Sequence, residues 1–252
     1  MVKFTSLRLA QTLSISSLDV NSVKPRETYD LIEPVLSCDD ETRFGSGRFN
    51  TGDGPKFVCG VNVLKQTDRC LVYSIGSAYD FSFEFAVRKA APACEIHTFD
   101  GTMDLASRPL SPQVSVDGIY FHNWNVVDSC ETTRLAVPSR CMKEILKELN
   151  HTARVITWLK IDCEGCEFTV IPKFVESSVK IDQLMIEVHG TNALRIASLF
   201  NCLHNAGLMI FHKERNHWGC DGYRCVEYSL MTSDYAKKVL RAFFNMKEAA
   251  SW

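Results

Sequence analysis

The chain has 252 residues, of which 46% are hydrophobic and 23% are charged, and this globular composition excludes a disordered, collagenous or coiled-coil chain. Lys and Arg number 28 and Asp and Glu number 30, so the net charge of −2 provides neither a basic excess for nucleic-acid binding nor an acidic tail. The apolar runs are too short to span a bilayer, and the length fits one α/β domain.

Residues 1–55 are expected to form an irregular lead with a glycine-rich loop, and residues 56–252 to form the folded domain. The stretch 1–27 shows no sustained hydrophobic period and lacks the continuous apolar segment of a signal peptide. The glycines between residues 38 and 55, too many for a helix or a central strand, are Gly45, Gly47, Gly52 and Gly54. We therefore expect a cytoplasmic protein, or one of the secretory pathway if the chain is a fragment of a longer protein.

Strand and helix patterns alternate from residue 56 onward. Short apolar runs bounded by Gly or Asp predict strands, and apolar residues at helical spacing after a Ser or Asn cap predict helices. In chain order the elements are strand 71–75, a helix after Ser82, strands 94–99 and 118–122, a helix after Ser139, strands 156–161 and 183–188, a helix after Asn192, strands 208–212 and 225–231, and a helix after Ser233.

This order predicts a mostly parallel sheet with helices on both faces. The last two strands follow one another without a helix, so they are expected to form an antiparallel hairpin at one edge. Ligands of such sheets bind at the carboxyl ends of the strands. The residues at those ends are Gly76, Asp100, Asn123, Trp124, Asn125, Asp162 and Glu187.

The turn after the first strand indicates which ligand to expect. A dinucleotide needs small residues that let its pyrophosphate approach a helix N-terminus, but only Gly76 is present here. Asp80 and Glu84 place negative charge at that point, which disfavours NAD and FAD and an oxidoreductase. A phosphate-free ligand with a positive centre, such as S-adenosylmethionine, fits better. Asp100 is then expected to accept its ribose hydroxyls, although Asp-Gly pairs also form simple turns.

Several segments resemble the FkbM-type S-adenosylmethionine-dependent methyltransferases. The resemblance covers about residues 56–232. The similar segments are Tyr73-Ser74-Ile75-Gly76 with Asp80 and Ser82-Phe83-Glu84, His97-Thr98-Phe99-Asp100, the K-x-D-x-E-G-x-E block from Lys160 to Glu167, Glu187-Val188-His189, and Cys225-Val226-Glu227-Tyr228-Ser229, the last resembling the animal methyltransferase-like branch. The chain departs from the family at Ala78 and Asp80, because the first turn of the family often holds an asparagine and a second glycine.

The resemblance implies a class I methyltransferase fold, which is a Rossmann-like α/β fold. Its seven-stranded, mostly parallel sheet has the order 3-2-1-4-5-7-6, helices on both faces and an antiparallel edge hairpin. S-adenosyl-L-methionine is the implied cofactor. The implied reaction is O-methylation of a hydroxyl on a sugar, glycan or small metabolite, with no nucleic-acid or membrane partner. The alternative is a catalytically weak binding module with this fold, which Ala78 and Asp80 favour.

The expected site comprises a cofactor set and a catalytic set. The cofactor set is Ser74, Gly76, Ala78, Asp80, Phe81, Ser82, Asp100, Gly101, Trp124, Asn125 and Asp162. Trp124 has two interpretations, since it either stacks on adenine or fills the sheet edge.

The catalytic set is Asp162, Glu187 and His189, with Glu164 as a further candidate. A hydroxyl acceptor is protonated at neutral pH and needs a base or a metal ion. Glu187 and His189 lie two apart on one strand and therefore share a face. They are expected to act with Asp162 as base and orienting groups, or to hold a divalent metal; the structural alternative is that they cap helix ends. A metal-free His189 base predicts activity rising through a pKa of about 6.5.

The chain has 11 cysteines, and because the number is odd, at least one lacks a partner within the chain. Cys38–Cys59 and Cys220–Cys225 are disulfide candidates, which would imply an oxidising compartment. Cys163-x-x-Cys166 is compatible with a redox or zinc motif, although the methyltransferase signature accounts for its position. The cysteines expected to be buried hydrophobic thiols are Cys94, Cys141 and Cys202.

Overall fold

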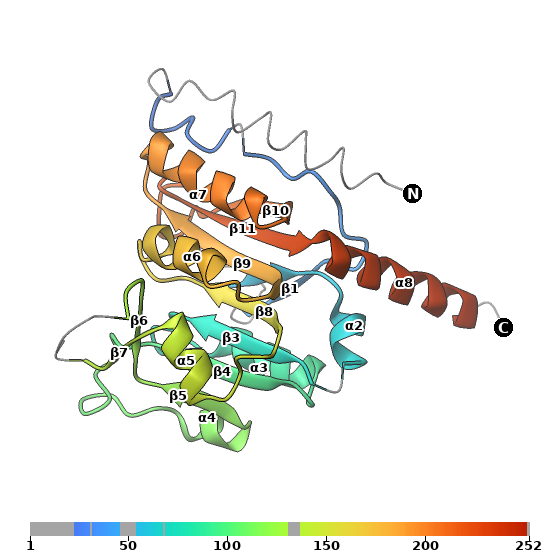
Figure 1. The fold of residues 1–252 in the computed structure, drawn as a ribbon, viewed down its shortest axis with the longest axis horizontal. Coiled ribbons are helices and arrows are strands. Elements are labelled where there is room, and N and C mark those ends of the chain that lie inside the picture. The colour runs from blue at the N-terminus through green and yellow to red at the C-terminus, as the bar shows by residue number, and fades with distance from the viewer. Residues whose placement is uncertain (1–22, 31, 46–53, 68, 131–136, 251–252) are drawn as a thin grey trace.

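A seven-stranded sheet lies at the centre of the computed structural model, which describes residues 23–30, 32–45, 54–67, 69–130 and 137–250 (Figure 1). Its strands are β3 (Leu71–Ile75), β4 (Glu95–Phe99), β5 (Ile119–His122), β8 (Ile156–Ile161), β9 (Ile181–His189), β10 (Leu208–Arg215) and β11 (Cys225–Thr232). They lie side by side in the order β10-β11-β9-β8-β3-β4-β5. Numbered within the sheet and read from β5, this is the predicted 3-2-1-4-5-7-6 order, so the class I methyltransferase fold is confirmed.

Strand direction also agrees with the prediction. Strands β3, β4, β5, β8 and β9 pair in parallel, whereas β11 runs antiparallel to both β9 and β10. Every residue of β3 and of β8 is buried, because helices cover both faces of a parallel sheet and leave no strand face for water. This is the physical reason that these two strands read as continuous apolar runs.

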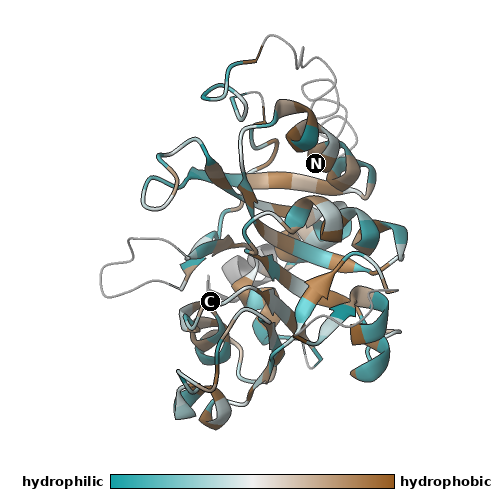
Figure 2. Cartoon of the chain, turned by 90° about the vertical axis from the view of Figure 1, so that its left-hand side faces the viewer, coloured by the Kyte–Doolittle hydropathy of each residue, from teal (hydrophilic) through white to brown (hydrophobic). Residues whose placement is uncertain are grey.

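Helices form a layer on each face of the sheet. On one face, residues of α5 (Met142–Glu148), α6 (Glu167–Glu176) and α7 (Ala193–Asn205) share a hydrophobic cluster with the strands. On the other, a second cluster unites α2 (Val61–Lys65), α3 (Ser82–Ala90), α4 (Pro112–Val116) and α8 (Ser233–Ala250) with the sheet. Figure 2 shows hydrophobic residues along the central strands and hydrophilic residues on the helices around them. Among the described residues, no helix is both long and apolar enough to cross a membrane.

Two small strand pairs were not predicted. Strand β1 (Thr42–Phe44) pairs antiparallel with β2 (Lys56–Val58), and β6 (Asn125–Val127) pairs in parallel with β7 (Ser139–Cys141). The predicted loop over 38–55 therefore contains a strand, while Gly47, Gly52 and most of 1–27 lie outside the described residues. The pair β1–β2 spans the predicted boundary at residue 55, and the division into a lead and a domain stays a prediction.

The predicted helix caps are correct at one position and shifted at others. The Asn192 side chain accepts a hydrogen bond from the Arg195 amide at 3.0 Å, as expected of an N-cap. Ser82 is instead the first residue of α3, and the Asp80 carboxylate accepts its amide hydrogen bond at 2.8 Å. The Ser139 prediction is wrong, because that residue lies in β7 and Cys141 caps α5.

The helix after the fourth strand, α6, begins at Glu167. Glu164, three residues earlier, has a left-handed backbone with φ of 55° and lies outside the helix. At the C-terminal helix, Thr232 Oγ1 accepts a hydrogen bond from the Tyr235 amide at 3.2 Å, so the cap lies one residue before Ser233.

All eleven cysteines lie in the described part of the chain, and ten of them form disulfides. Cys38–Cys59 and Cys220–Cys225 are confirmed, and Cys202 is the one free cysteine. The expectation of free thiols at Cys94 and Cys141 is wrong. The additional bridges are Cys70–Cys94, Cys130–Cys141 and Cys163–Cys166. Cys70 and Cys94 precede the adjacent strands β3 and β4, so the sheet brings together two thiols whose local sequences are merely apolar.

Candidate functional site

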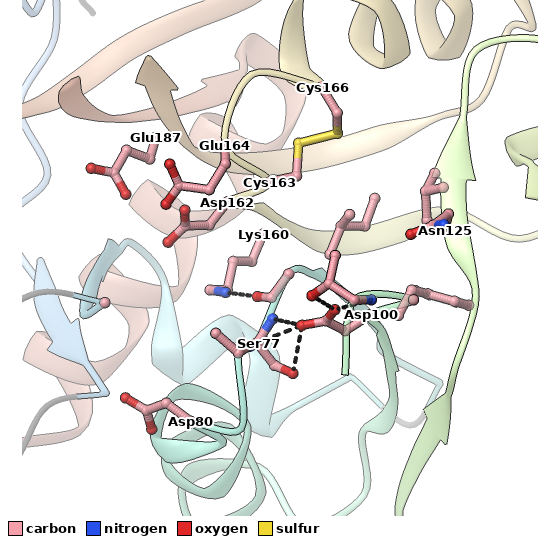
Figure 3. A pocket seen from close by; sticks show the side chains of 18 of the residues that line it. Ser77, Asp80, Asp100, Asn125, Lys160, Asp162, Cys163, Glu164, Cys166 and Glu187 are labelled. Carbon is pink, nitrogen blue, oxygen red and sulfur yellow. Dashed lines mark hydrogen bonds between the residues drawn. A yellow bond between two sulfur atoms is a disulfide. The ribbon is translucent and has the colours of Figure 1, made fainter. Parts of the chain in front are cut away.

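A cavity of about 370 Å³ lies at the carboxyl ends of β3, β4 and β8 (Figure 3), the position at which α/β sheets bind their ligands. Most of the residues expected from the sequence line it. They are Gly76, Ala78, Asp80, Ser82, Asp100, Gly101, Trp124, Asn125, Asp162, Glu164 and Glu187. The sheet topology therefore gathers residues that are separated by more than a hundred positions in the chain.

Two glycines allow the backbone segments around the cavity to approach one another. Gly76 has a left-handed backbone with φ of 81°, and a Cβ there would lie 1.6 Å from the carbonyl oxygen of Asp162. A Cβ on Gly101 would lie 2.4 Å from the side-chain oxygen of Asn125. Any side chain at either position would push apart the strand ends that form the cavity wall.

Asp100 holds the turn after β3 in place. Its Oδ2 accepts hydrogen bonds from the amides of Ser77 and Ala78 at 2.9 and 2.8 Å, and its Oδ1 accepts from Thr102 Oγ1 at 2.6 Å. Burial disfavours the carboxylate, but the hydrogen bonds from Thr102, Ser77 and Ala78 outweigh it and lower the pKa of Asp100. These bonds support a strained turn, in which Ala78 and Tyr79 have φ of 45° and 68°. Asp100 thus organises the cavity floor, a role its sequence position did not reveal.

On the opposite side of the cavity, carboxylates surround one buried lysine. The ammonium of Lys56 lies 3.0 Å from Asp162 Oδ2 and 4.0 Å from Glu187 Oε2, and it also contacts Glu227. Figure 3 shows Asp162, Glu164 and Glu187 close together on this side. The sequence analysis missed Lys56 and Glu227. Lys56 reaches the site from β2, 106 positions before Asp162 in the chain, and no local pattern signals it.

Burial and mutual repulsion give the carboxyl groups of this cluster different pKa values. Burial raises the pKa of Glu227 to about 7 despite Lys56. Burial, followed by the charges of Glu227 and Asp162, raises the pKa of Glu187 to about 8. For Asp162, burial is outweighed by Lys56 and Lys160, which hold its pKa well below the usual range. Asp162 is therefore ionised at neutral pH, whereas Glu187 loses its proton only at a pH just above neutral.

The carboxyl groups of three glutamates surround the imidazole of His189. Its Nδ1 lies 3.2 Å from Glu167 Oε1, and its Nε2 lies 3.4 Å from Glu164 Oε2 and 3.9 Å from Glu187 Oε2. Burial lowers its pKa, but the hydrogen bond and charge of Glu167 and the charges of Glu187 and Glu164 raise it to about 9. A His189 that is protonated at neutral pH orients carboxylates rather than accepting a proton. Glu167 also accepts hydrogen bonds from the amides of Gly165 and His189.

Three other residues lie away from the cavity. Ser74 is fully buried within β3, and Phe81 packs in the core, with its ring centroid 5.9 Å from that of Phe121. Glu84 is fully buried on the inner side of α3. The expectation that Asp80 and Glu84 both place charge at the turn is therefore wrong for Glu84, and of these two residues only Asp80 does so. Lys160, which the K-x-D signature contains, lines the cavity and donates to the Gly76 carbonyl.

Comparison with known proteins gives a family and several distant structures. A family model described as "Methyltransferase domain" matches residues 15–232, whereas no curated protein sequence matches the chain. One similar structure is a fibrillarin pre-rRNA processing protein of Methanococcus jannaschii, with a TM-score of 0.46 and 8% identity over 77% of this chain and 83% of that one. Another is Aeropyrum pernix fibrillarin in complex with S-adenosyl-L-methionine, with a TM-score of 0.42 and 11% identity over 78% of this chain and 84% of that one.

The N-methyltransferase NodS of Bradyrhizobium japonicum, in complex with S-adenosyl-L-homocysteine, is similar with a TM-score of 0.39 and 11% identity over 69% of this chain and 84% of that one. These three likenesses are distant, and we infer nothing about the substrate of this chain from them.

Proposed function

This chain belongs to the family described as a methyltransferase domain, and we propose that it is an FkbM-type, S-adenosylmethionine-dependent O-methyltransferase acting on a hydroxyl of a glycan or small metabolite. The single observation that carries the proposal is the cavity at the strand ends, where a carboxyl group that titrates near neutral pH lies beside an acidic ligand site.

The charge of the cavity suits S-adenosylmethionine. Besides Glu187, whose raised pKa leaves it largely protonated at neutral pH, four acidic side chains line the cavity against one lysine, Lys160, so the lining attracts the positive sulfonium and amino groups of this cofactor and repels a pyrophosphate. The four acidic side chains are those of Asp80, Asp100, Asp162 and Glu164. Because Gly76 and Gly101 lack side chains, the backbone segments around the cavity can approach one another, and Trp124 lies in the cavity wall. When bound, the cofactor supplies a methyl group that is activated by the positive sulfur.

Glu187 is the proposed base for the acceptor. With the cofactor bound, the acceptor oxygen would take its methyl group, leaving S-adenosylhomocysteine, and Glu187 would accept the hydroxyl proton on a carboxylate oxygen. Asn216 donates to Glu187 Oε1 at 2.8 Å, which orients the carboxylate. The raised pKa of Glu187 makes it a stronger base than an ordinary glutamate at the pH where it still ionises. Asp162 and Lys56 remain a charged pair that holds it in place.

A divalent metal ion does not fit the Asp162–Glu187–His189 group. The three ligand atoms lie within 4.8 Å of one another, but the Lys56 ammonium already lies 3.0 Å from Asp162 Oδ2 and 4.0 Å from Glu187 Oε2. An added divalent cation would lie close to this ammonium and be repelled by it. We therefore place no metal in the proposed mechanism.

The acceptor is proposed to enter beside Trp218. A second cavity of about 80 Å³ is lined by Trp218, Glu227 and Gly54 among others, and Gly54 also lines the larger cavity. The Trp218 side chain is 70% exposed, and an exposed indole offers a flat apolar face to the ring of a sugar. The ring of His212 stacks on that of Phe57, with 3.7 Å between the ring centroids, so we assign it no contact with the acceptor.

Calorimetric titration tests the proposed function. The wild-type protein is expected to bind S-adenosylmethionine. Asp100→Ala should weaken this binding by about 10- to 100-fold, because it removes the charged acceptor proposed for the ribose hydroxyls, and hydrogen bonds to a charged group contribute about 1.5–3 kcal/mol. Asp104→Ala is the matched control. Asp104 also accepts backbone hydrogen bonds in a turn, but it does not line the cavity, so its removal should leave binding unchanged.

Methyl transfer is then measured with labelled cofactor on a panel of glycans and hydroxylated metabolites. No binding at about 1 mM cofactor, the upper end of ordinary KM values, would rule out the enzyme. Binding without transfer to any member of the panel would favour the alternative, a methyltransferase-fold binding module. Ala78 and Asp80, where the first turn departs from the family pattern, are the features that favour this alternative.

The disulfides lead us to propose that the protein works in an oxidising compartment such as the secretory pathway, rather than in the cytoplasm. Five bridges are typical of proteins that fold outside the reducing cytosol. Thiol titration of the denatured, unreduced protein after secretory expression is expected to detect one free thiol, that of Cys202. Detection of eleven thiols in protein that retains full activity would exclude this proposal.

A further inference from the structure

A second cluster of chemically active side chains lies at the amino-terminal end of β4, at the opposite end of this strand from the proposed cofactor cavity. Glu95 begins β4 and His97 follows two residues later on the same face, while His151 comes from the turn after α5. The Nε2 atoms of His97 and His151 lie 2.9 and 3.0 Å from the same atom, Glu95 Oε1. The three ligand atoms all lie within 4.8 Å of one another.

The far side of each imidazole is also held in place. His97 Nδ1 lies 2.9 Å from His122 Nε2, and His151 Nδ1 lies 2.7 Å from the Tyr73 hydroxyl. An imidazole and a phenol each donate or accept a hydrogen bond. Without an ion, Nε2 of each histidine donates its hydrogen to Glu95 Oε1; with a cation in this position, both histidines can carry their proton on Nδ1 instead and give the lone pair of Nε2 to the cation. Outer partners of this kind orient the histidine ligands of protein metal sites.

We propose that Glu95, His97 and His151 form a binding site for Zn²⁺. Zinc bonds of about 2.0–2.2 Å in a tetrahedral site place neighbouring ligand atoms about 3.3 Å apart. The observed separations from Glu95 Oε1 need to widen by only a few tenths of an ångström to meet this geometry. Two imidazoles and one carboxylate favour zinc over magnesium, which prefers an all-oxygen octahedral set.

The surroundings provide access and a fourth ligand. The Glu95 side chain is 34% exposed, whereas those of His97 and His151 are 5% and 4% exposed, so the carboxylate moves more easily than the rings. A surface cavity lined by Glu95, His151 and Arg154 among others leads to the site, and water from it completes the coordination. Arg154 pairs with Glu95 Oε2, which leaves Oε1 for the ion, and its charge limits the affinity.

The test uses the full chain after treatment with a chelator. Calorimetry is expected to detect one equivalent of Zn²⁺, no Mg²⁺ at the same site, and a higher Tm with Zn²⁺ present, because an ion that binds only the folded state stabilises it. His97→Gln and His151→Gln are expected to weaken binding by at least about 10-fold. His189→Gln is the matched control, because it removes the imidazole of the Asp162–Glu187–His189 group. This variant should bind Zn²⁺ as the wild type does.

Two results would overturn the proposal. One is the absence of stoichiometric Zn²⁺ binding to the wild-type protein. The other is binding that survives in His97→Gln and His151→Gln but is lost in His189→Gln, which would place the ion at the larger cavity. Absorption of the Co²⁺-substituted wild-type protein keeps the test decisive if a variant fails to fold, because tetrahedral Co²⁺ with nitrogen ligands has intense visible bands and hexa-aqua Co²⁺ does not.

Discussion

Replacement of Glu187 by glutamine is expected to lower kcat by about 10²- to 10⁴-fold, the usual contribution of a positioned general base, while S-adenosylmethionine binding stays nearly unchanged. Glutamine has the same shape and keeps an oxygen that accepts the hydrogen bond from Asn216, observed at 2.8 Å. It cannot, however, take up the proton of the acceptor hydroxyl. The measurement is steady-state kinetics with an acceptor identified from the panel, together with a cofactor titration of each variant.

The pH profile provides a second check on the same residue. A base acts only when deprotonated, and the pKa of Glu187 is about 8, so wild-type kcat/KM is expected to rise with pH and level off above that value. The rise should be absent in Glu187→Gln. This differs from the sequence-based expectation of a rise at about 6.5 with His189 as the base, because the surrounding glutamates keep His189 protonated there.

Glu164→Gln is the matched comparison for Glu187→Gln. Both carboxylates line the cavity and approach His189, but the Glu164 side chain is 86% exposed and that of Glu187 is 3% exposed. Water solvates the exposed Glu164 side chain, so the loss of this carboxylate should cost far less activity than the loss of Glu187. A larger loss of kcat in Glu164→Gln than in Glu187→Gln would reject the assignment of the base.

Full activity in both Asp162→Asn and His189→Ala would remove these residues from the catalytic set.

Replacement of Lys56 by methionine is expected to destabilise the protein by about 3–5 kcal/mol, because removal of one partner from a buried ion pair leaves uncompensated charge in the interior. Lys56 is 1% exposed and contacts Asp162, Glu187 and Glu227. Methionine keeps most of the side-chain volume, so the effect reports charge rather than packing. Denaturant unfolding of the wild type and the variant measures the difference.

The pH dependence of that difference identifies the carboxylates as the cause. The pKa values of Glu187 and Glu227 are about 8 and about 7 in the folded protein, above the unfolded value of about 4.3. The folded state thus binds more protons than the unfolded state within this window, and stability falls as pH rises through it. Without Lys56 both pKa values rise further, so the variant should lose more stability at about pH 9 than at about pH 6.

Lys173→Met is the control for Lys56→Met. Lys173 also forms an ion pair, with Glu176 at 2.7 Å, but the two side chains are 52% and 63% exposed. Exposed pairs contribute little to stability, so the free energy of unfolding should hardly change. Equal losses in the two variants, or a loss in Lys56→Met that does not depend on pH, would contradict the view that this lysine neutralises a buried carboxylate cluster.

The sequence by itself determined the succession of strands and helices along the chain and the end of the sheet at which the cavity lies. Buried parallel strands require continuous apolar runs, and these runs mark β3 and β8 in the printed sequence. The residue after each such run lies at the carboxyl end of the sheet, so Gly76, Asp100 and Asp162 were placed at the cavity by periodicity alone. The resemblance to methyltransferases then added the cofactor and the arrangement of the strands.

Only the tertiary structure decided which groups meet at the site. Lys56 lies in a short strand after a glycine-rich stretch, and Glu227 lies in the last strand, so neither carries a local signal of its contact with Asp162. The same is true of Cys70 and Cys94, which become neighbours through sheet pairing. Local patterns show which side of an element is buried, because apolar residues on that side recur with the period of the helix or strand. Charge pairing, disulfide partners and pKa values depend on distances between segments far apart in the chain, and the packing of the elements sets those distances.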